Sequence, residues 1–131
     1  NKLNGGALFI DYGYMNNKNT NTLQSVMKHK YNDIKKNVGD ADITSLVNFS
    51  LYKEYFSLNG LLVEDIISQS YFLQRMGILE RAKILSKKLN LSQQINLNQR
   101  LKRLIDPKMM GKNFKVIFTK SKKCKFSLAF K

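Results

Sequence analysis

An uninterrupted apolar run is the first strong signal along the chain. Residues 7–10 are all apolar and are followed by Asp11-Tyr12-Gly13, which is typical of a strand that is buried on both faces and ends at a turn. We therefore predict a central parallel strand here. The asparagine-rich stretch 16–21 predicts a polar loop, whereas residues 22–26 fit either a short strand or a helical turn.

The next part of the chain changes from loop to helix. A second loop is predicted over residues 31–41. From Phe49 to Phe56 aromatic residues recur three and four positions apart, which predicts an amphipathic helix capped by Asn48 or Ser50 and ended by Asn59-Gly60. Residues 61–67 have the composition of a strand, so helix and strand alternate as in an α/β sheet layer.

Two further helices are predicted after this strand. The first covers residues 69–89 with a break at Gly77, and the second covers residues 92–105 and is stopped by Asp106-Pro107. The apolar face of the first helix is typical of a core stripe rather than a ligand site. No internal repeat or linker divides the chain, so we predict one domain.

The formal charge of +14 comes from 23 Lys and Arg against 9 Asp and Glu. Such a field attracts nucleic acid, anionic lipid or acidic protein surfaces. The bases are mostly lysines spread along the chain, however, and Lys, Asn and Ile are abundant together, as in proteins encoded by A+T-rich DNA. The densest cluster, within 120–125, lies between the apolar runs 114–118 and 126–130 and predicts a β-hairpin with its charges at a solvated tip. We expect no specific nucleic-acid partner.

Composition excludes several kinds of site. Cys124 and His29 are the single cysteine and histidine, so neither an internal disulfide nor a His/Cys metal cluster can form, and we expect no metal. No glycine-rich phosphate loop, Walker lysine, nucleophile elbow or HExxH pair is present. The apolar stretches fall short of the roughly 20 residues that span a bilayer, so no membrane insertion is expected.

The remaining candidate site is defined by position. Asp11 and Tyr12 close the predicted buried strand, and ligands of open α/β sheets collect outside the carboxyl ends of strands. Alternatively, Asp11 caps the turn and Tyr12 packs. His29 lies between two lysines and is expected to be exposed or packed. Asp42 and Thr44 could instead cap the helix near residue 49.

Several segments, taken in order, resemble the C-terminal half of the MidA-type S-adenosylmethionine-dependent methyltransferases. This family includes the mitochondrial protein arginine methyltransferase that assists complex I assembly. The similar segments are the glycine-rich lead into Ile10-Asp11-Tyr12-Gly13, then Thr22-Leu23-Gln24, Gly39-Asp40-Ala41-Asp42-Ile43-Thr44, Ser68-Gln69-Ser70-Tyr71-Phe72-Leu73, Met76-Gly77-Ile78 with Arg81, and Met110-Gly111-Lys112-Asn113-Phe114-Lys115-Val116.

The resemblance implies a fold. It predicts an α/β chain, residues 1–131, that forms a single partial domain: the C-terminal part of a Rossmann-like class I methyltransferase sheet with flanking helices and a C-terminal β-hairpin. Residues 8–11 become a late central strand, with residues 61–67 and 114–118 completing the sheet beside it. The N-terminal half that binds S-adenosylmethionine is expected to be absent. The strand at 8–10 then exposes an unpaired edge, which predicts marginal stability or aggregation.

The resemblance also implies a function. We expect methyl transfer from the cofactor S-adenosylmethionine to a protein, at an arginine guanidinium, linked to assembly of respiratory complex I. Expected partners are a protein substrate such as a complex I subunit and an N-terminal half supplied as a separate chain, in the bacterial cytoplasm or in mitochondria. Alone, the chain is expected to be inactive and not to bind the cofactor. The expected catalytic residues are Asp11 and Tyr12, and the expected substrate-binding residues are Tyr14, Gln24, Asp42 and Gln69.

One departure and two alternatives bear on this function. The family has Thr-x-His-Val-Asp-Phe where this chain has Thr44-Ser45-Leu46-Val47-Asn48-Phe49, so a histidine and an aspartate are replaced and activity is in doubt. The first alternative is a small basic nucleic-acid-binding protein, supported by the charge and by the aromatic residues within 52–56. The second is a non-functional gene remnant.

Overall fold

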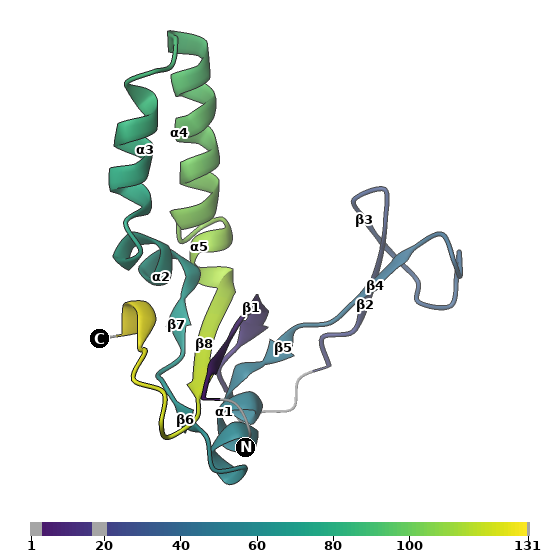
Figure 1. Cartoon of the computed structure of the whole chain (residues 1–131). Coiled ribbons are helices and arrows are strands. Elements are labelled where there is room, and N and C mark those ends of the chain that lie inside the picture. The colour runs from purple at the N-terminus through teal and green to yellow at the C-terminus, as the bar shows by residue number, and fades with distance from the viewer. Residues whose placement is uncertain (1–3, 17–20, 131) are drawn as a thin grey trace.

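The computed structural model describes residues 4–16 and 21–130 of the 131. The predicted loop at 16–21 therefore lies largely outside the described residues. The main body is built on a five-stranded sheet in the order β5-β1-β8-β6, with β7 also paired to β8 (Figure 1). Its strands are β1 (Gly6–Tyr14), β5 (Val47–Asn48), β6 (Leu62–Val63), β7 (Ile67–Ser68) and β8 (Phe114–Lys120).

Strand β8 is the central strand of this sheet. It pairs antiparallel with β1 from Gly6 opposite Lys120 to Tyr12 opposite Phe114, and antiparallel with β6 and β7 along its other edge. The predicted set of neighbouring strands is therefore confirmed. The parallel partner of β1 within the described residues is β5, which it meets only at its last two positions. The single predicted strand at 61–67 is interrupted and forms β6 and β7.

Helices cover both faces of the sheet, which confirms the α/β class. On one face, α1 (Phe49–Leu58) packs on β1, with the rings of Phe9 and Phe56 stacked at 5.3 Å between centroids. On the other face, Phe72 of α2 (Gln69–Arg75) forms a core cluster with Val116 and with Ala129 of the 3₁₀ turn η1 (Leu128–Phe130).

The prediction that β1 is buried on both faces is wrong. Leu8, Ile10 and Tyr12 are 38%, 43% and 42% exposed, whereas Val116 and Ile117 of the adjacent β8 are fully buried. The two strands differ in the number of strands paired with them. Strand β8 is more buried because it has a neighbouring strand along each edge. Between Gly6 and Tyr12, β1 has a described neighbour only on the β8 side, so the open edge predicted at residues 8–10 is present.

A separate three-stranded sheet forms an arm that extends from the main body (Figure 1). Its strands are β2 (Gln24–Met27), β3 (Lys30–Asn32) and β4 (Asp42–Thr44), in the order β3-β2-β4. The undecided segment 22–26 thus contributes a strand, and the predicted loop at 31–41 begins within β3. Because Asp42 and Thr44 lie in β4, the alternative that they cap the following helix is wrong. That cap is Asn48, whose Oδ1 accepts from the Leu51 amide at 3.3 Å.

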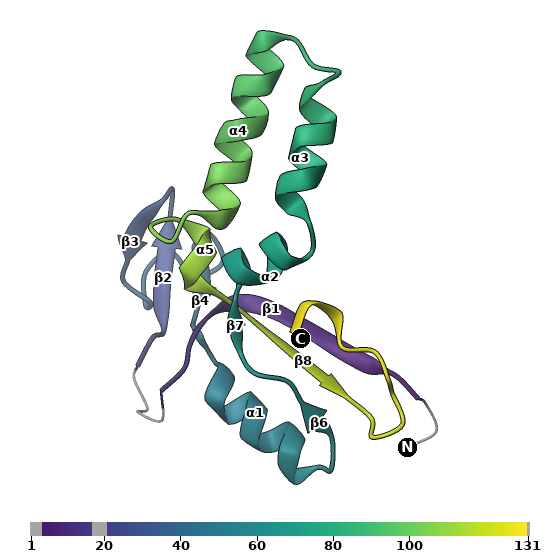
Figure 2. The same cartoon turned by 90° about the vertical axis from the view of Figure 1, so that its left-hand side faces the viewer.

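The remaining helices form a projection above the sheet (Figure 2). They are α3 (Ile78–Ser86), α4 (Leu91–Ile105) and the short α5 (Met110–Asn113). Gly77 separates α2 from α3 with a φ of 81°, as its predicted role as a helix break requires. A capping box of Asn90 and Gln93 starts α4, and the helix stops at Asp106-Pro107 as predicted.

The predicted C-terminal β-hairpin is wrong. After β8 the chain turns and packs Phe126 and Phe130 against Phe118, with ring centroids 6.1 and 5.9 Å apart, and ends in η1 rather than in a strand. Lys120 is buried rather than at a solvated tip. Its Nζ lies 2.7 Å from Glu64 Oε1 and also donates to the Phe126 carbonyl and the Ser127 hydroxyl, because a buried ammonium requires partners.

Candidate functional site

The carboxyl end of β1 holds the two predicted catalytic residues. Asp11 Oδ1 accepts the Tyr12 amide at 2.7 Å, and the ring of Tyr12 meets that of Phe114 edge to face at 5.1 Å. Asp11 lies within β1 and so does not cap the predicted turn, whereas Tyr12 packs on Phe114 as the alternative expected. Both side chains nevertheless remain exposed, so they are accessible to a substrate.

A lysine that the sequence did not single out lies opposite Asp11. Lys115 of β8 is the register partner of Asp11 and also of Ser68 in β7, so three polar residues form a row across three strands. Lys115 Nζ donates to the Lys112 carbonyl at 2.5 Å. Burial, and then the charge of Lys112, lower the pKa of Lys115. Lys115 belongs to one of the family-like segments, but strand register was needed to place it beside Asp11.

Tyr14 lies next to this row, where β1 meets β5. Tyr14 pairs with Asn48 and Gly13 pairs with Val47. A Cβ at Gly13 would collide with the Val47 carbonyl oxygen and would lie 2.7 Å from the Phe49 ring. The glycine is required by protein packing, and the space beside it is already filled. The glycine at this strand end is therefore explained by close packing of β1 against β5 and Phe49.

Gln24 and Asp42 lie in the arm and not in the main sheet. Gln24 is opposite Thr44 and Asp42 is opposite Val26, so both side chains share one face of the arm. The root of the arm is tied to β5 through the Leu46 amide, which donates to Thr22 Oγ1 at 3.0 Å. The structure thus separates these two predicted substrate residues from Asp11 by the root of the arm.

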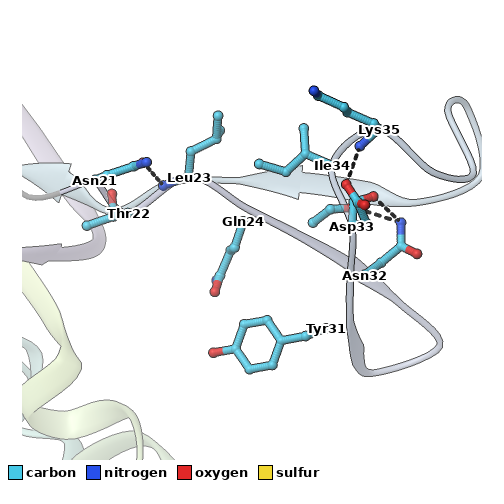
Figure 3. A pocket seen from close by; sticks show the side chains of 10 residues that line it. Asn21, Thr22, Leu23, Gln24, Tyr31, Asn32, Asp33, Ile34 and Lys35 are labelled. Carbon is cyan, nitrogen blue, oxygen red and sulfur yellow. Dashed lines mark hydrogen bonds between the residues drawn. The ribbon is translucent and has the colours of Figure 1, made fainter.

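A hollow of about 640 Å³ runs along the arm. In Figure 3 the side chains of Gln24 and Tyr31 project to the same side of it, and Tyr31 is 85% exposed. The polar groups of its wall bond within the arm: Asn32 Nδ2 donates to the Asp33 carbonyl, and Asp33 Oδ1 accepts the Lys35 amide. The hollow therefore offers a partner a shallow contact surface, because these wall groups are already hydrogen-bonded within the arm.

Gln69 has a structural contact. Its side chain is buried, and Nε2 donates to the Leu104 carbonyl at 2.9 Å. This bond ties the start of α2 to the last turn of α4, where backbone carbonyls otherwise lack partners. The structure therefore places Gln69 at the base of the helical projection, with its amide engaged by protein.

Other sequence candidates are placed as follows. His29 and Lys28 occupy the two-residue turn between β2 and β3 with φ values of 63° and 50°. Tyr52 and Phe56 contact Phe9, so two of the aromatic residues behind the nucleic-acid alternative face the sheet.

In the described ranges no group of three potential metal ligands occurs. Among the helices described, none combines the length and apolar character that a membrane-spanning helix needs.

Comparisons with known proteins show what this arrangement is similar to. A family model described as "Putative S-adenosyl-L-methionine-dependent methyltransferase" matches residues 1–67. The mitochondrial protein arginine methyltransferase NDUFAF7 of Xenopus tropicalis is 33% identical over 78 residues, which are 60% of this chain and 18% of that protein.

Two solved structures from Burkholderia thailandensis, both of one superfamily, share the fold. Each is 27% identical to this chain and matches 95% of it, with TM-scores of 0.79 and 0.77. The chain covers 34% and 33% of their lengths, about one third. The second was solved bound to S-adenosyl-homocysteine, the product left when S-adenosylmethionine donates its methyl group. The predicted family resemblance, the fold class and S-adenosylmethionine as the family's cofactor are all confirmed.

Proposed function

Since the chain belongs to the family of S-adenosyl-L-methionine-dependent methyltransferases, we propose that it forms the C-terminal part of such an enzyme and presents a protein arginine for methylation. In this proposal residues 1–131 are one partial domain, and the methyl donor is held by a part of the family fold that this sequence does not include. The lengths support the proposal, because the chain spans about a third of the solved relatives that it matches.

The open edge of β1 is the observation that carries the proposal. Leu8, Phe9 and Ile10 are each more than a third exposed, and the backbone groups along this edge have no described strand partner between Gly6 and Tyr12. Exposed strand edges of this kind accept another strand. A strand added here would continue the sheet and cover the exposed apolar residues.

The chain's own residues would act by orienting the substrate. In the proposal the Asp11 carboxylate accepts hydrogen bonds from an arginine guanidinium, because planar pairs of this kind are strong and directional. The exposed face of Tyr12 contacts the same cation. The hydrogen bond from the Tyr12 amide to Asp11 Oδ1 holds the carboxylate in place. Accurate positioning of this sort can supply much of a rate enhancement.

The finer parts of the proposal come from the relatives. NDUFAF7 is named as a mitochondrial protein arginine methyltransferase, which supports arginine as the methylated residue. A role in complex I assembly, inactivity of the chain alone and a location in mitochondria or the bacterial cytoplasm stay predictions. Tyr14, Gln24 and Asp42 remain candidate substrate contacts: Tyr14 lies on the same strand as Asp11, and Gln24 and Asp42 share one face of the arm.

Calorimetry and methyl-transfer assays test the proposal together. The chain alone should give no heat with S-adenosylmethionine at micromolar concentrations. The chain mixed with the polypeptide for the donor-binding region from the same genome should bind it and transfer methyl groups to arginine, detected by mass spectrometry. Asp11→Asn should abolish transfer without loss of assembly, whereas Asp65→Asn, at an exposed carboxylate in another loop, should leave it unchanged. Micromolar binding by the chain alone, or methylation of lysine, would contradict the proposal.

A further inference from the structure

The α3–α4 helical projection is strongly cationic, with Glu80 in the first turn of α3 as its one acidic residue. Between residues 81 and 105 the sequence contains no Asp or Glu. The same segment contains seven cationic residues, and all of them are exposed: Arg81, Lys83, Lys87, Lys88, Arg100, Lys102 and Arg103. The two ion pairs found in the described part of the chain, Lys53–Asp65 and Lys120–Glu64, lie elsewhere. Apart from Glu80, the projection has no acidic side chain that could neutralise this positive charge.

Aliphatic side chains are exposed along the same projection. Leu79 at its base is 42% exposed, Ile84 is 62% exposed, and Leu91 and Ile95 near the tip are 74% and 52% exposed. Exposed apolar residues with charged residues around them are typical of protein interaction surfaces. A partner that complements both features has acidic side chains together with apolar ones.

The base of the projection lies at the candidate site. The chain enters the projection from Ser68 through α2 and leaves it through α5, which leads into Phe114. Phe114 contacts Tyr12, and Lys115, the next residue, lies opposite Asp11. Both views show α3 and α4 rising from this end of the sheet (Figures 1 and 2). A partner that lies along the projection would therefore have its end close to Asp11 and Tyr12.

We infer that the α3–α4 projection is a docking surface for an acidic protein segment, and that the methylated arginine lies in such a segment. This inference rests on the proposed function and adds its substrate class. A strongly cationic surface attracts acidic partners and repels basic ones. Arginine-rich basic tails are thereby excluded, and a single arginine among acidic and aliphatic residues is selected.

The distribution of the charges favours a protein over an anionic membrane. Helix α4 has 15 residues and so is about 22 Å long. A flat bilayer at the tip would come close to Lys87 and Lys88, whereas Arg100 and Arg103, toward the far end of α4, would lie beyond the screening length of about 10 Å. A protein segment lying along the helices is long enough to extend from Lys87 and Lys88 to Arg100 and Arg103.

The absence of aromatic residues in this part of the sequence favours a protein over nucleic acid. Residues 73–113 contain no Phe, Tyr or Trp, so the projection cannot stack bases, which is the main sequence-tolerant contact to single strands. The exposed Ile84, Leu91 and Ile95 also have no counterpart in a phosphate backbone. Duplex binding through charge alone remains as a measurable outcome.

Fluorescence anisotropy without any methyl donor tests the inference. The probes are a labelled peptide with a central arginine flanked by glutamate and leucine, and the same peptide with each glutamate replaced by lysine. The chain should bind the acidic peptide and not the basic one. Lys87→Glu with Lys88→Glu, and separately Arg100→Glu with Arg103→Glu, should each weaken binding by about tenfold, since both positions contact the partner.

A matched control separates docking from net charge. Lys122→Glu with Lys123→Glu changes the charge equally at exposed positions beyond the other end of β8 and should weaken binding by no more than about twofold. Circular dichroism verifies that each variant keeps its helices. Equal losses in all three variants, equal binding of the basic peptide, or tighter binding of phosphatidylglycerol vesicles or duplex DNA would overturn the inference. Because no methyl donor is used, failure here is distinguishable from failure of the proposed function.

Discussion

Strands β8 and β1 are paired over seven positions, yet their environments differ. Val116 and Ile117 of β8 are fully buried, whereas Leu8 and Ile10 of β1 are 38% and 43% exposed. Both segments are strongly apolar in sequence, so composition does not explain the difference. Strand β8 has neighbours on both edges, and β1 has a described neighbour along one edge for most of its length. Apolar sequence thus indicates where burial is required, and the exposed part of β1 indicates where a further partner is needed.

Truncation of one side chain in each strand should give the largest contrast. Ile117→Ala removes a fully buried side chain and should lower the free energy of unfolding by about 2–5 kcal/mol. Ile10→Ala removes a side chain that is already 43% exposed and should cost about 1 kcal/mol, because less area returns to water. Urea denaturation followed by circular dichroism measures both. Equal losses would mean that β1 is covered in solution.

The ion pair at the end of β8 should give the next largest effect. Glu64→Gln leaves the buried ammonium of Lys120 without its carboxylate and should cost about 1.5–3 kcal/mol, the value of hydrogen bonds to charged groups. The Lys53–Asp65 pair has the same 2.7 Å separation but is exposed. Asp65→Asn is therefore its control and should leave the urea midpoint unchanged. A similar loss in both variants would show that burial of Lys120 does not matter.

Within β1, the closed end can be compared with the open part. Gly13→Ala places a methyl group against the Val47 carbonyl and the Phe49 ring and should destabilise the fold by about 1–3 kcal/mol. At Gly5 an added methyl group meets nothing within 4 Å, so Gly5→Ala should be neutral. Thermal melting of the two variants provides the test. If Gly13→Ala is tolerated, the contact between β1 and β5 is looser than the structure indicates.

Local signals in the sequence predicted much of the secondary structure. Asn48 as a helix cap, Gly77 as a break and Asp106-Pro107 as a stop are all found in the structure. Each of these signals acts on residues within a few positions, so the neighbouring sequence is enough to predict its effect. The open edge at residues 8–10 was predicted from the family resemblance rather than from the apolar pattern, which indicated burial on both faces.

The failures all involve distant partners. Residues 126–130 are as apolar as a strand, but Phe126 and Phe130 pack on Phe118 without strand pairing. Lys120 resembles its exposed neighbours in sequence, and the carboxylate that pairs with it when buried, Glu64, lies 56 positions away. Lys115 was missed for the same reason, because its position opposite Asp11 depends on strand register.

Amide hydrogen exchange tests the open edge of β1 most directly. In an antiparallel pair, alternate amides of a strand point to each edge. Alternate amides between Gly6 and Tyr12 should therefore exchange much faster than those of β8 in the chain alone, and should become protected when the donor-binding region is added. Protection of every β1 amide in the chain alone, at the level of β8, would contradict the account.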